Sequence, residues 1–271
     1  MISLIFLDVD GTLIGAKGHV EDCVWQATEK ARAAGVKLSL CTGRPCFGVA
    51  QKVAERLGPD VPHIFQNGAQ IARASGEPVK VRALKEAATR ALLTHAREHN
   101  LTLELYTPTN LYVERKTALS DGHAKMIGVT AIVSDLGKVI QDEPVVRAQW
   151  VVTKDDLRRA TAFEHKDIDV GIATSPALKG AVFASLTQKG VSKGSAVRYV
   201  ADLLKVDLAN SMGVGDSSGD IPLLEEVGFP VAMANAAPEL LADYPNHAGH
   251  VDECGVVLAL ESALQHTETP E

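Results

Sequence analysis

The stretch SLIFLDVDGTLIG, residues 3–15, joins a short apolar run to two acidic residues one position apart. Asp8 and Asp10 follow the run Leu4–Leu7, and Gly11 then breaks the extended pattern. Carboxylates held close together are costly to bury unless a cation or a shared proton accompanies them. The alternative without chemistry is an acidic loop exposed after a strand, so the rest of the chain must decide between the two.

The composition is that of an ordinary globular protein. The 271 residues are 46% hydrophobic and 23% charged, and the formal net charge is −7. Since basic runs are absent, nucleic acid and anionic membranes are not expected as partners. The chain has no apolar run of about 18 residues and opens directly into an apolar run, without the features of a signal peptide. We therefore expect a soluble, cytoplasmic protein that is a monomer or a homodimer.

The cysteines give no sign of a disulfide framework. They are Cys23, Cys41, Cys46 and Cys254, at irregular spacings. A chain of this length does not need disulfides to be stable, and no CxxC pair indicates a zinc or redox site. The cysteine pattern therefore fits a reducing cytoplasm without disulfide staples.

Short apolar runs alternate with helix-length amphipathic segments at both ends of the chain. This alternation predicts an α/β core of three layers, with a mostly parallel, Rossmann-like sheet between helices. The strands are expected at Leu4–Leu7, Val36–Cys41, His63–Phe65, Ser211–Val214 and Pro230–Met233. Helical spacing of apolar residues is clearest over 20–34 and 196–204.

The middle of the chain has a different pattern. A helix-like segment at Leu84–Ala96 is followed by pairs of strand candidates separated by short turns. Such pairs favour antiparallel pairing and an α+β arrangement. We therefore expect residues 82–187 to form an inserted α+β domain, and residues 1–81 and 188–271 to form the catalytic core.

Acids, a hydroxyl and a lysine follow the core strands. In open α/β sheets ligands bind outside the carboxyl ends of the strands, so these groups are expected at one edge. They are Asp8, Asp10, Thr42, Gly43, Arg44, Asp216 and Asp220, together with Lys193 at the start of a helix. Magnesium prefers oxygen ligands and is often bound by a few carboxylates together with a substrate phosphate. This set therefore predicts a site for Mg²⁺ and a phosphate group.

The order of these motifs resembles the haloacid dehalogenase superfamily, specifically the Cof-like branch of subfamily IIB sugar phosphatases with a C2B-type cap. The likeness covers nearly the whole chain. The motifs that carry it are DVDGT at 8–12, TGR at 42–44, Lys193 in KGVSKG and GDSSGD at 215–220. QNGA at 66–69 and VAMANA at 231–236 also look like recurrent segments of that branch.

The resemblance implies a mechanism through an aspartyl-phosphate. Asp8 would attack phosphorus, and Asp10 would protonate the leaving oxygen and then activate water. Thr42 and Lys193 would hold the phosphoryl oxygens, with Gly11, Gly43 and Arg44 also at the substrate.

The resemblance also implies the metal ligands. Mg²⁺ would be held by Asp8, the Asp10 backbone carbonyl and Asp216, with Asp220 in support. One position departs from the family pattern, because Gly219 stands where Asn is usual. The phosphoryl chemistry is therefore a firmer expectation than any particular substrate.

Three alternatives remain at this point. A phosphomutase would use the same phosphorylated aspartate, and a phosphate-binding protein would use the site without catalysis. The third is a serine hydrolase, because GVSKG at 190–194 matches the G-x-S-x-G pattern around Ser192. Its histidine would have to be His247, His250 or His266. This alternative explains neither the Asp8/Asp10 pair nor GDSSGD.

Overall fold

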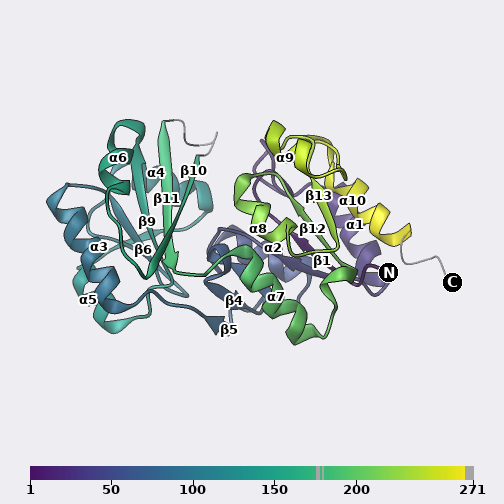
Figure 1. The fold of residues 1–271 in the computed structure, drawn as a ribbon, viewed down its shortest axis with the longest axis horizontal. Coiled ribbons are helices and arrows are strands. Elements are labelled where there is room, and N and C mark those ends of the chain that lie inside the picture. The colour runs from purple at the N-terminus through teal and green to yellow at the C-terminus, as the bar shows by residue number, and fades with distance from the viewer. Residues whose placement is uncertain (175–177, 179, 266–271) are drawn as a thin grey trace. The chain divides into compact units, whose positions relative to one another are not determined.

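The computed structural model describes residues 1–174, 178 and 180–265, and the chain divides into two compact units (Figure 1). The first unit comprises Met1–Gly43, Ala50–Val79 and the chain from Ser192 onward. The second comprises Arg44–Val49 and Lys80–Val191. The predicted α/β core and α+β insert are both present in the fold, and each unit has its own sheet.

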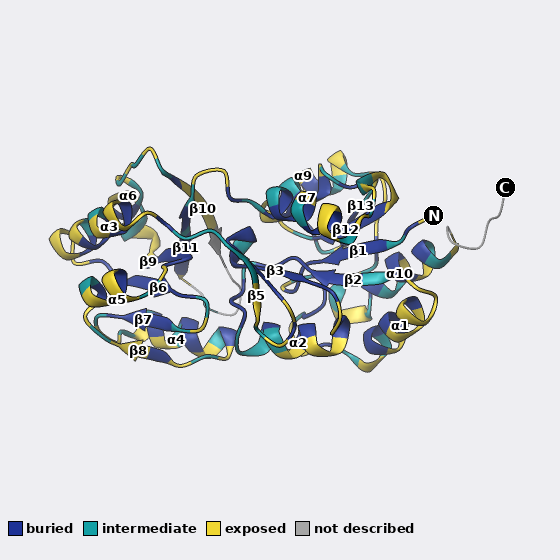
Figure 2. Cartoon of the chain, turned by 90° about the horizontal axis from the view of Figure 1, so that it is seen from below, coloured by how far each residue is buried: buried dark blue, intermediate teal, exposed yellow. Residues whose placement is uncertain are grey.

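The first unit is built on a parallel sheet of four strands in the order β13-β12-β1-β2. Their bounds are β1 (Leu4–Leu7), β2 (Lys37–Leu40), β12 (Ser211–Gly215) and β13 (Phe229–Ala232). All four residues of β1 are buried, as expected for a central parallel strand covered on both faces (Figure 2). The predicted strands lie within one residue or so of these bounds.

A smaller sheet extends this layer. Its order is β3-β4-β5, with β3 (His63–Phe65), β4 (Gln70–Ala72) and β5 (Pro78–Val81). An isolated parallel bridge between Cys41 and Ile64 connects the end of β2 to β3. The carboxyl end of β3 is thereby placed next to the chain that follows β2.

Helices cover both faces of the parallel sheet. They are α1 (Asp22–Ala33), α2 (Val49–Leu57), α7 (Lys193–Leu204), α8 (Ile221–Leu224), α9 (Pro238–Asp243) and α10 (Val256–Gln265). Short 3₁₀ turns lie at η1 (Gln66–Gly68), η2 (Leu208–Asn210), η3 (Ser218–Asp220) and η4 (Val251–Glu253). Leu4 and Phe6 of β1 share a core with α7 and α8, while α1 and α10 pack against each other.

The second unit contains a sheet of six strands in the order β10-β11-β9-β6-β7-β8. The strands are β6 (Leu103–Tyr106), β7 (Leu111–Val113), β8 (Ala131–Val133), β9 (Arg147–Thr153), β10 (Ile168–Thr174) and β11 (Ala181–Gln188). The neighbouring pairs are antiparallel except for β7 and β8, which are parallel. The parallel pair was not predicted, because its two strands are joined through a helix rather than a short turn.

The helices of the second unit are α3 (Glu86–Glu98), α4 (Ala118–Ile127), α5 (Leu136–Asp142) and α6 (Lys154–Thr161). One face of the sheet forms an apolar core with α3, α5 and α6 around the fully buried Trp150. Strand β6 places Glu104 and Tyr106 on the alternate side, where the Glu104 carboxylate accepts hydrogen bonds from Tyr106 Oη and His123 Nδ1 at 2.8 Å. Trp150 and Tyr106 are therefore packing residues of this unit.

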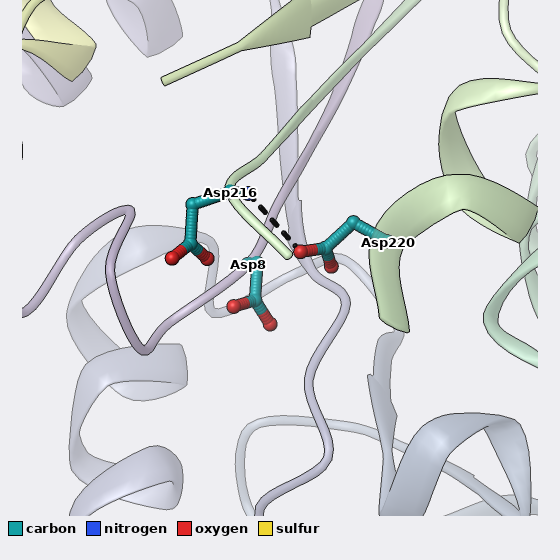
Figure 3. A group of neighbouring side chains, drawn as sticks. All are labelled: Asp8, Asp216 and Asp220. Atoms are coloured by element: carbon teal, nitrogen blue, oxygen red, sulfur yellow. Dashed lines mark hydrogen bonds between the residues drawn. The ribbon is translucent and has the colours of Figure 1, made fainter. Parts of the chain in front are cut away.

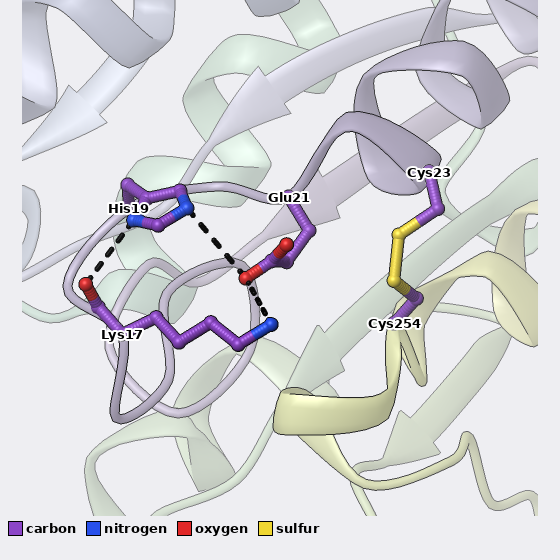
Figure 4. The surroundings of a disulfide bond; sticks show 5 residues. All are labelled: Lys17, His19, Glu21, Cys23 and Cys254. Atoms are coloured by element: carbon purple, nitrogen blue, oxygen red, sulfur yellow. Dashed lines mark hydrogen bonds and ion pairs between the residues drawn. A yellow bond between two sulfur atoms is a disulfide. The ribbon is translucent and has the colours of Figure 1, made fainter.

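A disulfide joins Cys23 to Cys254, so the expectation of a chain without disulfides is wrong (Figure 4). Cys23 lies in α1 and Cys254 lies between η4 and α10. The two cysteines are 231 positions apart in sequence, but their Cα atoms are 6.4 Å apart because α1 and α10 pack together. Cys41 and Cys46 are free and buried.

No helix in the described part of the chain is both long enough and apolar enough to cross a membrane.

The disulfide predicts a measurable contribution to stability. Replacing Cys23 and Cys254 by serine together should lower the free energy of unfolding of the first unit by about 2–4 kcal/mol, because the cross-link restricts the unfolded chain. Calorimetric unfolding midpoints provide the measurement. Dithiothreitol should lower the midpoint of the native protein and leave that of the double variant unchanged. If dithiothreitol did not change the unfolding midpoint of the native protein, the cross-link would be contradicted.

Candidate active site

Two acids lie at the carboxyl ends of adjacent parallel strands. Asp8 directly follows β1, and Asp216 directly follows β12. The Asp8 amide donates to the Val214 carbonyl at 3.1 Å, which continues the pairing of the two strands to this point. Asp220 joins them, and carboxylate oxygens of Asp8, Asp216 and Asp220 lie within 4.8 Å of one another (Figure 3). The structure therefore brings together three of the acids predicted from the sequence.

Asp220 organises the loop that carries Asp216. Its Oδ2 atom accepts hydrogen bonds from the backbone amides of Asp216 and Ser217, at 3.1 and 3.0 Å, and from Ser217 Oγ at 3.0 Å. These bonds close the turn η3 around a fully buried carboxylate. The backbone does not require a glycine at 219, since a Cβ atom there would meet only Ser217 Oγ, at 3.4 Å.

Lys193 connects the two sides of the cluster. It is the first residue of α7, whose N-terminus is fixed by a capping box between Ser192 and Ser195. Its Nζ atom donates to Asp8 Oδ1 at 2.7 Å and to Asp220 Oδ1 at 2.5 Å. Burial by itself would lower the pKa of Lys193, but the carboxylates of Asp220 and Asp8 raise it well above the usual value. Lys193 is therefore an ammonium ion between two carboxylates.

The cluster has more acidic than basic groups. With all three carboxyl groups ionised, the single ammonium would leave an excess of two negative charges in the site. Burial raises the pKa of Asp8 well above its usual value, and the charges of Asp220, Asp216 and Asp10 raise it further against the opposing effect of Lys193. Burial and the charge of Asp220 also raise the pKa of Asp216 to about 7. Additional positive charge would stabilise the ionised forms of both acids.

The residues fit a divalent cation. Asp216 Oδ1 is buried and has no hydrogen-bond partner, and such a carboxylate oxygen is a suitable ligand for a hard cation. Asp220 is a poorer ligand than the sequence suggested, because donors already occupy both of its oxygens. Asp8 and Asp216 are therefore the side chains best placed to hold an ion, with Asp220 positioning them.

Gly11 is required at its position for two reasons. Its φ of +78° is in the left-handed region, and a Cβ atom there would lie 2.0 Å from Asp216 Oδ2. The loop is closed by the Val9 carbonyl, which accepts from the amides of Leu13 and Ile14 at 3.0 and 2.8 Å. Asp10 is exposed in this loop, and its charge contributes to the raised pKa values of Asp8 and Asp216.

The second motif lies beside β3. Thr42 is buried, its amide donates to the Ile64 carbonyl at 2.9 Å, and its own carbonyl accepts from the Asn67 amide at 3.0 Å. A Cβ atom on Gly43 would lie 2.8 Å from Asn67 Oδ1, so the glycine permits this approach. Arg44 belongs to the second unit, and its contact with substrate stays a prediction.

Two amide side chains at the same edge received no role from the sequence. Gln66 is fully buried with both side-chain amide atoms unpaired, and it precedes Asn67 in two consecutive left-handed backbone conformations. Asn235, after β13, bonds to the loop that carries Gly11. Their sequence positions could have predicted a role at this edge, because Gln66 in QNGA and Asn235 in VAMANA each come shortly after a core strand.

The serine hydrolase alternative finds no support in the geometry. Ser192 Oγ accepts from the Ser195 amide at 3.1 Å and serves as the cap of α7. His247 Nε2 bonds to the carbonyls of Leu241 and Tyr244, and His250 Nδ1 accepts from the amide of Asp252. His266 lies outside the described residues. The G-x-S-x-G match is therefore explained by helix capping.

The fold and the acidic cluster define a Rossmann-like α/β protein with a carboxylate site at the strand ends. Comparison with protein families gives the class more closely, since the haloacid dehalogenase-like hydrolase family matches residues 5–260. The chain belongs to this family, and the predicted phosphatase class of enzyme is confirmed.

Relatives are similar over nearly their whole length. "Putative phosphatase YxeH" of Bacillus subtilis is 30% identical over 97% of this chain and 99% of its own. The phosphoglycolate phosphatase of Methanothermobacter thermautotrophicus is 27% identical over 91% of this chain and 92% of its own.

Solved structures support the fold. The haloacid dehalogenase superfamily phosphatase BT1666 of Bacteroides thetaiotaomicron superposes with a TM-score of 0.81 at 24% identity, covering 97% of this chain and 95% of that chain. The subclass IIB sugar phosphatase BT4131 superposes with a TM-score of 0.79 at 20% identity, covering 96% and 98% of the two chains.

Removing the ammonium should destabilise the protein. Lys193→Met would leave Asp8 and Asp220 buried without their cation, and breaking a buried pair in this way costs about 3–5 kcal/mol. Urea unfolding without divalent ions at pH 8 measures the loss, and the exposed Lys30→Met serves as the control. Adding Asp8→Asn to Lys193→Met should recover part of the loss, since it removes one of the carboxylates. Native stability in Lys193→Met would refute the ion pairs.

The raised pKa of Asp216 predicts how cation binding depends on pH. The cation must displace the proton of Asp216, and that of Asp8 where it is protonated, so apparent affinity for Mg²⁺ or Mn²⁺ should fall by at least about tenfold per pH unit below pH 7. Titration calorimetry in two buffers would measure affinity and proton release.

The same pKa has a consequence for the ion-free protein. The folded protein binds this proton more tightly than the unfolded chain, so the contribution of Asp216 to stability decreases as pH rises from about 4 to 7. Asp216→Asn should weaken cation binding and flatten both pH dependences. A native affinity independent of pH between 5 and 8 would contradict the assignment.

Proposed function

We propose that the protein is a Mg²⁺-dependent phosphatase that hydrolyses a small phosphomonoester, with sugar phosphates as the expected class, through an aspartyl-phosphate on Asp8. The observation that carries the proposal is the Asp8 carboxylate, held by Lys193 next to Asp216 at the carboxyl edge of the sheet. The names of the relatives support phosphoester hydrolysis, and one of them names phosphoglycolate as substrate.

The first half of the reaction transfers the phosphoryl group to the protein. A carboxylate oxygen of Asp8 attacks phosphorus while the bond from phosphorus to the leaving oxygen breaks. Asp10 donates its proton to that oxygen, which departs as an alcohol. The exposed position of Asp10, one residue beyond Val9, suits a group that exchanges protons with substrate and water.

The second half releases the phosphoryl group. Asp10, now ionised, takes a proton from water, and the water oxygen attacks phosphorus as the bond to Asp8 breaks. Inorganic phosphate leaves, and both carboxyl groups return to their starting states. Splitting one displacement into two in this way lowers each barrier.

The surrounding residues bind the phosphoryl group and the cation. Lys193 and Thr42 would hold phosphoryl oxygens, and Gly11, Gly43 and Arg44 would lie against the substrate. Asp8, Asp216 and the backbone carbonyl of Asp10 would hold Mg²⁺, with Asp220 orienting the loop. When bound, the cation neutralises charge on the transferring group.

The proposal includes a cytoplasmic protein that is a monomer or a homodimer and needs no nucleic acid or membrane partner. The cytosol keeps most thiols reduced, so the bond between Cys23 and Cys254 would be subject to reduction there.

Asp8→Asn should abolish phosphatase activity, because an amide is not a nucleophile toward phosphorus. Phosphate release would be measured from sugar phosphates, phosphoglycolate, nucleotides and p-nitrophenyl phosphate, with Mg²⁺ or EDTA. We expect Mg²⁺-dependent turnover to fall at least about 10³-fold in Asp8→Asn, and to remain in the control Asp22→Asn, an exposed acid of α1.

The outcome separates the alternatives. Turnover that survives in Asp8→Asn would remove Asp8 as nucleophile. Activity unaffected by EDTA would remove the metal from the proposal. Absence of phosphate release from every compound, together with conversion of one sugar phosphate into its isomer with the phosphate on another oxygen, would favour a mutase.

A further inference from the structure

Asn235 makes two hydrogen bonds that connect distant parts of the first unit. Its Nδ2 atom donates to the Gly11 carbonyl at 2.8 Å, and its Oδ1 atom accepts from the Val251 amide at 2.9 Å. It follows β13, and two residues earlier the Met233 amide bonds to the Gly215 carbonyl at 2.9 Å. Asn235 is therefore carried by the extension of a core strand, next to the chain that leads to Asp216.

The hydrogen bond to the Gly11 carbonyl lies where the loop after β1 approaches Asp216. Gly11 follows Asp10 directly, and its α-carbon faces the Asp216 carboxylate so closely that no side chain could fit between them. The Gly11 amide is already bonded to the Ile14 carbonyl at 2.9 Å. Because Asn235 donates to the Gly11 carbonyl, both the amide and the carbonyl of Gly11 are hydrogen-bonded. These two bonds fix the position of the loop next to Asp216.

The other end of the loop is held by the same C-terminal turn. Asp252 Oδ1 accepts a hydrogen bond from the Ala16 amide at 2.7 Å. The neighbouring Val251 amide donates the hydrogen bond that Asn235 Oδ1 accepts. Cys254 attaches this turn to α1 through the disulfide. The loop after β1 is thus tied to residues 251–254 at two points, one of them through Asn235.

We propose that Asn235 is a positioning residue, which holds the loop of residues 9–14 against Asp216 and so sets the placement of Asp10 for the reaction. The catalytic part rests on the proposed phosphatase function, whereas the holding of the loop does not. The role needs a donor and an acceptor on one short side chain, which asparagine has and ionised aspartate lacks.

Two substitutions with a matched control test this role. Asn235→Asp keeps the acceptor for Val251 but loses the donor for Gly11, and Asn235→Ala loses both. Asn246 supplies the control, because its Nδ2 atom also donates to a backbone carbonyl, that of Pro230 at 3.1 Å, in the same C-terminal segment. Asn246→Asp and Asn246→Ala therefore match the chemical changes away from the loop.

The first measurement is hydrogen exchange of the loop, followed by mass spectrometry of peptides covering residues 9–16. Both Asn235 variants should exchange at least tenfold faster there than the native protein, with α7 peptides unchanged. The Asn246 variants should match the native protein. Native exchange in both Asn235 variants would overturn the proposal, and equal acceleration in α7 peptides would assign Asn235 to general stability.

The second measurement is steady-state kinetics on the best substrate from the panel. Both Asn235 variants should lose 10-fold to 100-fold in kcat with KM changed less than threefold. Faster loop exchange with native kcat would overturn the catalytic part alone. If the native protein releases no phosphate at all, the proposed function fails while the exchange result still decides whether Asn235 holds the loop.

Discussion

The ammonium of Lys193 between Asp8 and Asp220 is the interaction on which the site depends. Without it, carboxylates from different strands and turns would be buried close together with no compensating charge. Each partner is placed by ordinary local structure: Asp8 by the end of β1, Asp220 by the turn η3, and Lys193 by the capped start of α7. The parallel sheet brings these elements to one edge, and the ion pairs make that arrangement tolerable.

The acids of this site could be predicted from sequence because the fold places them by a general rule. Apolar runs indicated β1 and β12, and the carboxyl ends of adjacent parallel strands must lie side by side. Asp8 and Asp216 follow those ends directly. Gly11 was predicted to lie at the substrate, which stays a prediction, and in the structure its α-carbon faces the Asp216 carboxylate.

Other contacts could not be predicted because they depend on how helices and turns pack after the sheet has formed. Cys23 and Cys254 are separated by nearly the whole chain, and their spacing carries no periodic signal. Asn235 reaches Gly11 across 224 positions, with a side chain common in any loop. The parallel β7 and β8 pair shows the same limit, since a strand of three residues contains too little pattern to fix its direction.

The charge balance also bears on the proposed binding of phosphate, for which one lysine would not be enough. Both hydrogen bonds described for Lys193 Nζ go to carboxylates, Asp8 and Asp220. A phosphate ester would bring further negative charge to a cluster that has an excess of two when its acids are ionised, so the lysine by itself would not overcome the repulsion. A divalent cation on the Asp8 and Asp216 side would cancel that excess and leave the ammonium available to the incoming oxygens. In the proposed reaction the cation and the lysine would act together, which is consistent with the unpaired oxygen of Asp216 and with its raised pKa.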